Sequence, residues 1–473
     1  MSTHDLQDLI TILDQSITLK HGLVCVKDEK RLRATIHRLA EVSALESGAR
    51  QGLARYLTRL IALSLGIIPA SIHELYAARG RGETPANFTV PAMNLRILSF
   101  EAAKAVFRAA APLDAAALIF EIARSEMAYT DQRPSEYVTS MLAAAIAEGY
   151  RGPVFIQGDH FQVSAKRYAS DPETEVQSIR DLIVEAIQAG FFNIDIDTST
   201  MVDLSKPTVP EQQTVNVDLS TRFTAFIRSK EPKWVTISIG GEIGEVGGHN
   251  STEEELRAYM DGYNAELKRL APGAVGISKI SIQTGTSHGG VVLPDGSIAK
   301  VSVDFDTLRN LSSVSRKDYG LGGAVQHGAS TLPEEAFGEF LENQAVEIHL
   351  ATNFMNMLFE VMPADLRDSM YAYLDEKFVS DRKPDMTDEQ FYYKVRKNAV
   401  GPFKQQTWNL PADKKAEMGR IWEKQFSKLF KQLGVAGTRK YVEQTVHPLV
   451  VQPDLNFYLG GATLEEEVSD LAD

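Results

Sequence analysis

Histidines lie at or shortly after the ends of several short apolar runs, where the strands of a β/α fold would stop. Five of the ten histidines have this position: His160, His249, His288, His327 and His349. In a parallel barrel the carboxyl ends of the strands meet on one face, so that side chains there converge. Neutral imidazoles from three strands, with one coordination position left open, make a catalytic zinc site. We predict that His160, His288 and His327 hold a zinc ion.

Carboxylates accompany these histidines. Asp159 directly precedes His160, where it could accept or donate a proton beside a metal-bound substrate. Alternatively, it orients a ligand histidine. Asp197 and Glu242 follow the fourth and fifth apolar runs, and hard carboxylate oxygens suit a second or alternate metal position. The other interpretation of these two residues is a salt bridge to a lysine or arginine of the barrel.

Glycines surround two of the histidines. Gly285 and Gly289 flank one of them, and Gly328 follows another, with Ser330 two residues further on. Without side chains in the way, backbone N–H groups can approach a phosphate closely. In barrels the phosphate site commonly lies at the loops after the seventh and eighth strands. We therefore expect a phosphate site that includes Gly289, Gly328, Ser330 and, after the eighth run, Thr352.

Eight short apolar runs alternate with patterns of helix length, and these elements must position the polar residues. The runs cover 88–93, 116–122, 154–157, 192–196, 235–239, 277–283, 323–326 and 346–350, with helical patterns such as 175–188, 252–267 and 333–342 between them. This alternation predicts an α/β fold, a parallel (β/α)8 TIM barrel. A doubly wound open sheet is the structural alternative, but no GxGxxG follows the first run, which argues against a dinucleotide-binding fold.

Helical patterns also flank the barrel. Residues 32–39, 53–65 and 71–78 carry apolar side chains three and four positions apart, which is typical of amphipathic helices. We predict an N-terminal helical segment at 1–84, the barrel at 85–358, and a helical extension at 359–473 that ends in an acidic tail. The chain has 473 residues, more than the roughly 250 that one barrel requires.

Composition excludes several classes of protein. The formal net charge is −14 without basic clusters, which argues against nucleic acid as the main partner. No apolar run reaches membrane-spanning length, and the start, MSTHDLQDLI, lacks the apolar core of a secretory signal. The single cysteine, Cys25, fits a cytoplasmic protein whose metal is held by histidines and carboxylates.

Six short motifs, in order along the barrel from Phe88 to Asn356, resemble those of the class II fructose-bisphosphate and tagatose-bisphosphate aldolase family. They are FTVPAMN at 88–94, GDH at 158–160, GTSHG at 285–289, VDFD at 303–306, HGAS at 327–330 and AT at 351–352. The resemblance implies a zinc-dependent, reversible aldol cleavage of a ketose bisphosphate, with fructose 1,6-bisphosphate as the first candidate.

The resemblance also implies roles for individual residues. Asp159 would handle the proton of the C4 hydroxyl, and Asp197 and Glu242 match the outer metal position of the family. Asn94 and Ser125 are expected to contact the substrate. A monovalent cation, K⁺ or Na⁺, is expected near Gly289, and a homo-oligomer is expected because many barrel enzymes of this kind are dimers or tetramers.

Three features depart from the family pattern. In EIGEVGGHN at 242–250, Asn250 stands where the family has a mobile glutamate. Glu245 or His249 could replace that acid/base, and His249 has the better intrinsic pKa. His349 stands where the family has a substrate-binding asparagine, so the substrate could differ. The N-terminal helices and the region beyond Glu360 have no counterpart in ordinary members.

Two other functions remain open. The C-terminal extension and the stretch from 158 to 199 also resemble the non-catalytic partner subunit of tagatose-bisphosphate aldolase, although this chain keeps the three histidines and Asp159. The second alternative is an epimerase, or an aldolase for unphosphorylated sugars, that works with the same metal chemistry. Affinity for phosphate would distinguish it.

Overall fold

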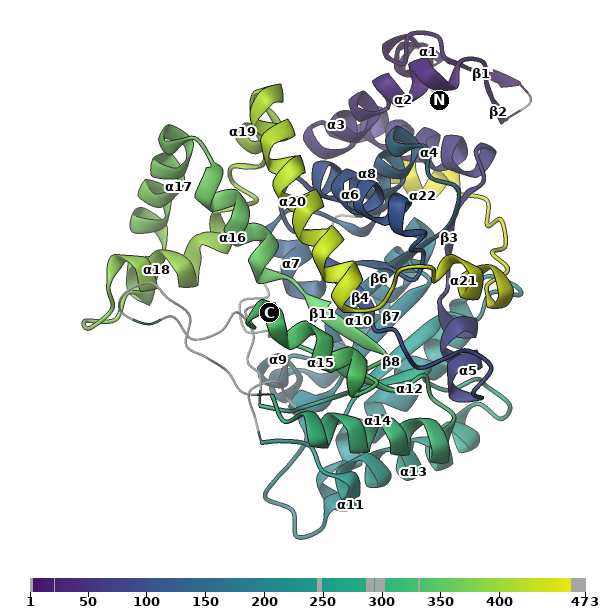
Figure 1. Ribbon diagram of the computed structural model, residues 1–473, viewed down its shortest axis with the longest axis vertical. Helices are drawn as coiled ribbons and strands as arrows, with labels where there is room; N and C mark the ends of the chain where they lie inside the picture. The colour runs from purple at the N-terminus through teal and green to yellow at the C-terminus, as the bar shows by residue number, and fades with distance from the viewer. Residues whose placement is uncertain are drawn as a thin grey trace.

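Eight parallel strands close into a barrel in the computed structural model, which describes residues 3–20, 22–244, 249–285, 293, 303–330 and 332–460. The strands are β4 (Val90–Asn94), β5 (Ile119–Ala123), β6 (Gly152–Gln162), β7 (Asn193–Asp197), β8 (Ser238–Glu242), β9 (Lys279–Ile282), β10 (Ala324–Gln326) and β11 (Glu347–Leu350). Pairing of β11 with β4 and of β6 with β7 closes the ring. This confirms the predicted (β/α)8 barrel and excludes the open sheet (Figure 1).

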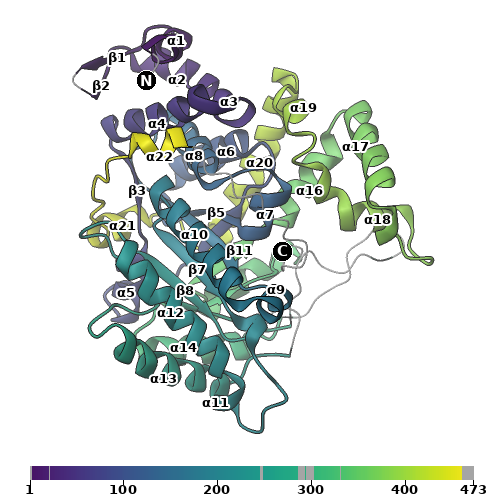
Figure 2. The same ribbon diagram turned by 180° about the vertical axis from the view of Figure 1, so that it is seen from behind.

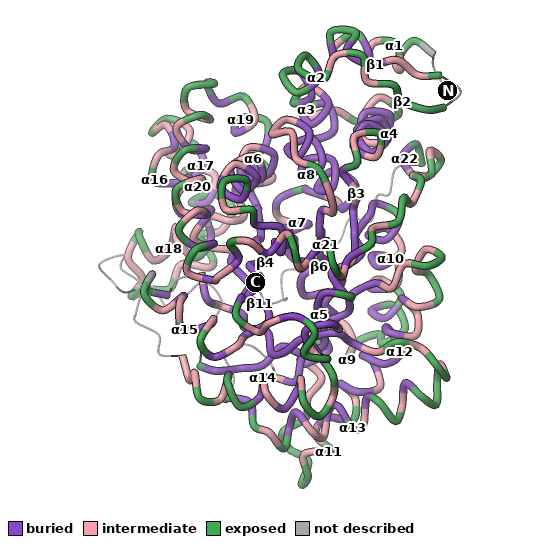
Figure 3. The backbone as a smooth tube through the Cα atoms, turned by 45° about the vertical axis from the view of Figure 1, so that its right-hand side comes forward, coloured by how far each residue is buried: buried purple, intermediate pink, exposed green. Residues whose placement is uncertain are grey.

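Helices surround the barrel because one face of each is apolar. They are α6 (Ser99–Ala110), α8 (Pro134–Glu148), α10 (Pro172–Ala189), α12 (Thr214–Lys230), α13 (Glu253–Leu270), α14 (Phe305–Tyr319) and α15 (Phe337–Glu342). In α10, for example, Val176, Ile179 and Ile183 are buried at helical spacing, and the Asp171 side chain caps the first turn. The strands and the inner helix faces form the buried centre of the molecule (Figure 3).

A helix from the C-terminal region completes this outer layer. Helix α20 (Ala412–Gln432) packs against α6, α15 and α16 (Thr352–Val361). Buried Trp422 donates from its indole N–H to the carbonyl of Phe354, 3.0 Å away. Just beyond the helix, the carbonyl of Leu433 accepts from the Thr89 N–H, 2.8 Å away, beside the start of β4. The domain boundary at 358/359 stays a prediction, but the barrel is covered partly by residues beyond it.

The remaining C-terminal helices lie further out. They are α17 (Ala364–Lys377), α18 (Asp388–Val395), α19 (Lys404–Trp408), α21 (Arg439–Thr445) and α22 (Leu455–Gly460). Helices α17 and α18 stand to one side of the barrel in both views (Figures 1 and 2). Among the residues that the structure describes, no helix combines the length and the apolar composition needed to cross a membrane.

The N-terminal segment is not helical throughout, contrary to its sequence pattern. It contains α1 (Thr3–Ile12), α2 (Glu29–Thr35), α3 (His37–Leu45), α4 (Gly48–Ser64) and α5 (His73–Gly80), but also a hairpin of β1 (Ile17–Lys20) and β2 (Leu23–Val26), and a third strand, β3 (Ile67–Ala70). In a strand of four residues, the alternation of apolar and polar side chains is too short to be recognised between segments with helical spacing.

Strand β3 joins the amino-terminal end of the barrel. It pairs in parallel with β6, from Ile67 opposite Gly152 to Ala70 opposite Phe155, and β6 pairs with β7 only from Gln157 onward. Asn193, the first residue of β7, donates to the carbonyls of Ala70 (3.1 Å) and Ile156 (3.0 Å). The N-terminal segment therefore forms part of the barrel floor.

Candidate active site

Five buried side chains meet at the carboxyl ends of the barrel strands. Asp159 and His160 come from β6, Glu242 ends β8, His327 directly follows β10, and His349 lies on β11. The ring centroids of His160 and His327 are 4.3 Å apart, and those of His327 and His349 are 4.0 Å apart. Three imidazoles and two carboxylates in contact form a cluster suited to metal binding and proton transfer.

A β-bulge lets β6 present two consecutive residues to this cluster. The register of β6 against β7 shifts between Gly158 and Phe161, and His160 has a φ of +39°. Adjacent strand residues normally point to opposite faces, and a bulge is the usual way to re-aim one of them. Gly158 permits the bend, since a Cβ there would lie 2.4 Å from the ring of Phe161. Asp159 and His160 can therefore both serve the site.

Three members of the cluster could hold a metal ion. His160, Glu242 and His327 each offer one ligand atom within 4.8 Å of the other two. Two imidazoles and one carboxylate are a known donor set for catalytic zinc, so the residues present fit the ion. The third predicted histidine ligand, His288, lies outside the described residues. Asp197 contacts His160, with 3.0 Å between Oδ2 and Nδ1, and its role at an alternate metal position stays a prediction.

The charges around His160 also favour a cation here. Burial lowers the pKa of His160, but Asp159, Glu242 and Asp197 outweigh burial and raise it to about 10. Burial, with the repulsion of Asp197, raises the pKa of Glu242 well above its ordinary value. The pKa of a carboxylate rises in this way when its charge is desolvated and repelled by a neighbouring carboxylate. A cation bound between His160 and Glu242 would stabilise the charged carboxylate and the neutral imidazole, and would therefore counter the rise in both pKa values.

Asp159 is held on both of its oxygens. Asn94 at the end of β4 donates from Nδ2 to Asp159 Oδ2 and to Glu126 Oε2, each 2.9 Å away. His349 Nδ1 lies 3.0 Å from Asp159 Oδ1. Burial raises the pKa of Asp159, but His160 and His349 hold it well below its ordinary value. Asp159 is therefore an ionised, oriented carboxylate that can accept a proton.

His349 is surrounded by carboxylates. Its Nε2 lies 2.7 Å from Glu347 Oε1, and its Nδ1 lies 3.2 Å from Glu121 Oε1, in addition to the contact with Asp159. These neighbours outweigh burial and raise the pKa of His349 well above its ordinary value. With acceptors on both ring nitrogens, the imidazole is a double donor. An asparagine at this position would be neutral and would donate only from its single amide nitrogen, so it could not place donors on opposite sides of a ring.

A buried ammonium group lies beneath His349. Lys279 Nζ donates to Gln157 Oε1 (2.8 Å), to Asp195 Oδ2 (2.9 Å) and to Glu347 Oε1. Gly240 makes room for the contact with Asp195, since a Cβ there would lie 2.4 Å from Asp195 Oδ1. The barrel centre is therefore a hydrogen-bonded network rather than the usual stack of branched apolar side chains.

Sequence reasoning did not single out the residues of this network. Glu121, Lys279 and Glu347 are charged residues within or at the edge of predicted buried runs. A charge in such a run is costly unless it is paired. The presence of charged residues in buried runs could therefore have indicated a functional or structural network of paired side chains.

The expected phosphate-binding residues lie on two loops that touch. Gly328 has a φ of +68°, which favours glycine, and it follows His327 in the loop after β10. The Ser330 hydroxyl accepts a hydrogen bond from the Ala351 N–H, 2.5 Å away, in the loop after β11. Thr352 begins helix α16, and helix N-termini suit phosphate because their first N–H groups have no partner within the helix. Ser125 is buried on α7 (Arg124–Tyr129), and Gly289 lies outside the described residues.

The proposed mobile acid/base residues do not join the cluster in the described part of the chain. The His249 side chain is 55% exposed, and its Nε2 lies 2.7 Å from Glu255 Oε1 on α13. Asn250 donates to Asp304 Oδ2, 3.1 Å away. Glu245 lies outside the described residues. The structure therefore places His249 against a helix rather than against Asp159.

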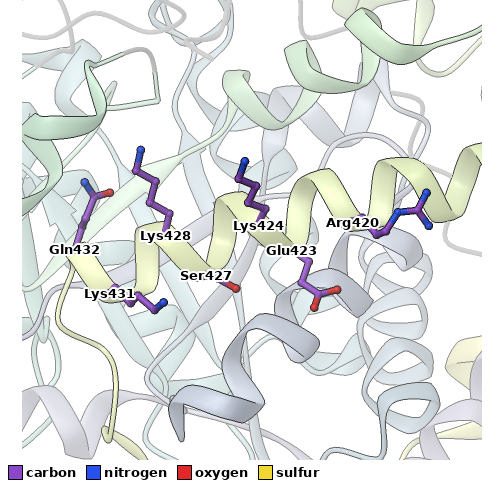
Figure 4. A pocket seen from close by; sticks show the side chains of 7 residues that line it. All are labelled: Arg420, Glu423, Lys424, Ser427, Lys428, Lys431 and Gln432. Carbon is purple, nitrogen blue, oxygen red and sulfur yellow. The ribbon is translucent and has the colours of Figure 1, made fainter.

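An open hollow of about 610 Å³ lies elsewhere, along the outer face of α20. Four basic side chains line it, Arg420, Lys424, Lys428 and Lys431 (Figure 4). The composition suggested no basic cluster, but helical spacing brings these charges into one row. The hollow contains none of the candidate catalytic residues.

Residues 84–407 match the model of a family described as fructose-bisphosphate aldolase class-II. This confirms the resemblance and extends it beyond Asn356. Similar solved structures include a fructuronate-tagaturonate epimerase from Cohnella laeviribosi, at 12% identity over 89% of this chain and 90% of that chain, with a TM-score of 0.54. A probable tagatose 6 phosphate kinase from Sinorhizobium meliloti 1021 has 17% identity, coverage of 78% and 97%, and a TM-score of 0.50.

A third similar structure is the fructose-bisphosphate aldolase from Campylobacter jejuni, at 16% identity, with coverage of 78% of this chain and 96% of that chain and a TM-score of 0.47. No curated protein matches the chain. At identities this low, the solved structures show that the barrel fold is shared.

Proposed function

Because the chain belongs to the class II fructose-bisphosphate aldolase family, we propose that it is a zinc-dependent aldolase that reversibly cleaves a ketose bisphosphate, with fructose 1,6-bisphosphate as the first substrate to test. The observation that carries the proposal is the buried cluster of Asp159, His160, Glu242 and His327 at the carboxyl ends of the strands. It unites a metal-binding donor set with an oriented carboxylate.

His160, Glu242 and His327 would hold the metal, with His288 as a further proposed ligand. When bound, zinc would supply a Lewis acid that polarises the ketone and stabilises the negative charge left on it. The buried position of the three described ligands excludes water from the same place, which strengthens such electrostatic effects.

Asp159 would take the proton of the C4 hydroxyl. As that proton leaves, the C3–C4 bond breaks, C4 becomes an aldehyde, and the electron pair of the bond remains on the ketone half of the substrate. Asn94 and His349 would keep the Asp159 carboxylate ionised and aimed during this transfer. In the reverse direction, Asp159 would return the proton to the new hydroxyl.

Backbone N–H groups near Gly328, Ser330 and Thr352 would bind one phosphate group. The contact between Ser330 and Ala351 holds the two loops together, and a helix begins at Thr352. Loops and helix N-termini in this position are common phosphate sites in barrels.

A second candidate is an epimerase that acts on an unphosphorylated sugar or sugar acid. His349 favours it, because a doubly donating imidazole replaces the asparagine with which family members bind their substrate. The epimerase from Cohnella laeviribosi acts, by its name, on fructuronate and tagaturonate. Proton transfer at Asp159 would serve either reaction. The partner-subunit alternative is disfavoured, because an unused buried cluster of charges would only cost stability.

The experiment is a cleavage and epimerisation assay on the purified protein as isolated, after chelation, and after zinc is restored. Fructose 1,6-bisphosphate, tagatose 1,6-bisphosphate, fructuronate and tagaturonate are compared, with Asp159→Asn as the inactive control. Cleavage of a bisphosphate that is lost on chelation and regained with zinc supports the aldolase. Epimerisation without cleavage favours the second candidate. A protein that binds no metal overturns both.

A further inference from the structure

Helix α5 lies at the floor of the barrel although it comes from outside the family match, which begins at residue 84. In Figures 1 and 2 this violet helix lies among the teal and green helices of the barrel. Arg79 holds it there, since its guanidinium donates to the carbonyls of Gln344 (3.0 Å) and Ala345 (3.1 Å) before β11.

Helix α5 places a tyrosine hydroxyl inside the barrel. Tyr76 is fully buried, and its hydroxyl donates to Glu347 Oε2, 2.5 Å away. Gly322 permits this approach, because a Cβ there would lie 2.9 Å from the Tyr76 Cβ. Burial, with the nearby Glu347 charge, raises the pKa of Tyr76 well above its ordinary value, so the hydroxyl remains a donor.

Glu347 connects this hydroxyl to the candidate site. While Tyr76 donates to Oε2, the other oxygen, Oε1, accepts from Gln157 Nε2 (2.9 Å) and from Lys279, and faces His349 Nε2 at 2.7 Å. The opposite ring nitrogen of His349 reaches Asp159 at 3.0 Å. A continuous series of hydrogen bonds therefore runs from Tyr76 through Glu347 and His349 to Asp159.

We propose that Tyr76 is a positioning residue of the active site, and that the N-terminal segment is thereby a working part of the enzyme. By occupying Oε2, Tyr76 fixes the rotation of the Glu347 carboxylate, so that Oε1 is directed at His349. His349 is then held with its second nitrogen toward Asp159. Networks of this kind hold a reacting group in place because each member fixes the next.

The central test is Tyr76→Phe, which removes only the hydroxyl. Tyr263→Phe is the matched control, because Tyr263 is also fully buried and its hydroxyl donates to Thr224 Oγ1 (2.9 Å), outside the network. We expect Tyr76→Phe to lower kcat by roughly 10-fold, as for other residues that support a catalytic group. KM should change less than twofold, and Tyr263→Phe should leave kcat unchanged.

A second measurement does not depend on activity, although the role itself rests on the proposed function. In protein labelled with ¹⁵N-histidine, the His349 ring signals are assigned from their loss in His349→Gln. We expect Tyr76→Phe to shift these signals and Tyr263→Phe to leave them in place. If no substrate is turned over, the proposed function fails, and the spectra still decide whether Tyr76 positions His349.

Glu347→Gln provides an independent variant that keeps the shape of the side chain. It should shift the same His349 signals and lower kcat at least as much as Tyr76→Phe. Unchanged His349 signals in folded Tyr76→Phe, or a loss of kcat equal to that of Tyr263→Phe, would overturn the proposal. If Tyr76→Phe does not fold, unchanged His349 signals in Glu347→Gln overturn it.

Discussion

His349 and Asp159 are in direct hydrogen-bond contact, with 3.0 Å between Nδ1 and Oδ1, although 190 positions separate them in the chain. The bond joins β11 to β6 across the mouth of the barrel. Asn94 donates to the other oxygen of Asp159. The candidate base is thus held between a cationic ring and an amide, and both partners favour its ionised form.

Asp159→Asn should remove the proton acceptor without removing the metal site. An amide cannot take the proton of a substrate hydroxyl, so we expect kcat to fall by about 10²–10⁴-fold. Bound zinc, measured by elemental analysis, should remain at the level of the unaltered protein. A variant that keeps more than a tenth of kcat would show that another group accepts the proton.

His349→Asn introduces the asparagine that the resemblance to the family predicts at this position. The shorter amide cannot reach Glu347 and Asp159 together as the imidazole does. We expect kcat on the native substrate to fall by roughly 10-fold or more. The kcat/KM value for fructose 1,6-bisphosphate should rise relative to the kcat/KM values for the other substrates tested. A preference that does not change would mean that His349 does not select the substrate.

His327→Ala removes one imidazole from the candidate metal site. Affinity for zinc is measured by competition with a chelator. It should fall by more than the roughly 10–100-fold that is typical when a residue that only supports a metal ligand is replaced. His249→Ala is the matched control, because His249 is half exposed and contacts Glu255 instead. Equal losses of zinc in the two variants would contradict the assignment of His327 as a ligand.

Much of the barrel could be predicted because strands buried on both faces appear as continuous apolar runs. Each of the eight predicted runs overlaps a strand. The run shifted furthest along the chain is 235–239, because the strand itself is Ser238–Glu242. Strand β3 could not be predicted in this way. Its four residues include Pro69 and pair with one neighbour only, as is usual for a proline at the edge of a sheet.

The site could be predicted in part because strand ends converge in any parallel barrel. This rule led to His160, His327 and His349, but it could not place His249, whose position depends on the path of its loop. The bulge that aims His160 depends on pairing with β7, which leaves no local signal in the sequence. The homo-oligomer and the monovalent cation remain predictions.

Stability should depend on pH through His73, which lies on α5. Burial, with Arg228 and Arg81, lowers the pKa of His73 to about 4, and its Nδ1 is buried without a hydrogen-bond partner among the described residues. The unfolded chain therefore binds a proton at a higher pH than the folded protein does. The stability that neutral His73 allows is complete above the unfolded pKa of about 6.5 and is lost as the pH falls toward 4.

The expected loss between pH 7.5 and pH 5 from this one group is about 2 kcal/mol. It is measured as the free energy of unfolding in urea at the two pH values. His73→Gln cannot titrate, so its stability should fall by about 2 kcal/mol less than that of the unaltered protein over the same interval. If both proteins lose equal stability, His73 is protonated in the folded state as readily as in the unfolded chain, and the acid sensitivity of the protein comes from other groups.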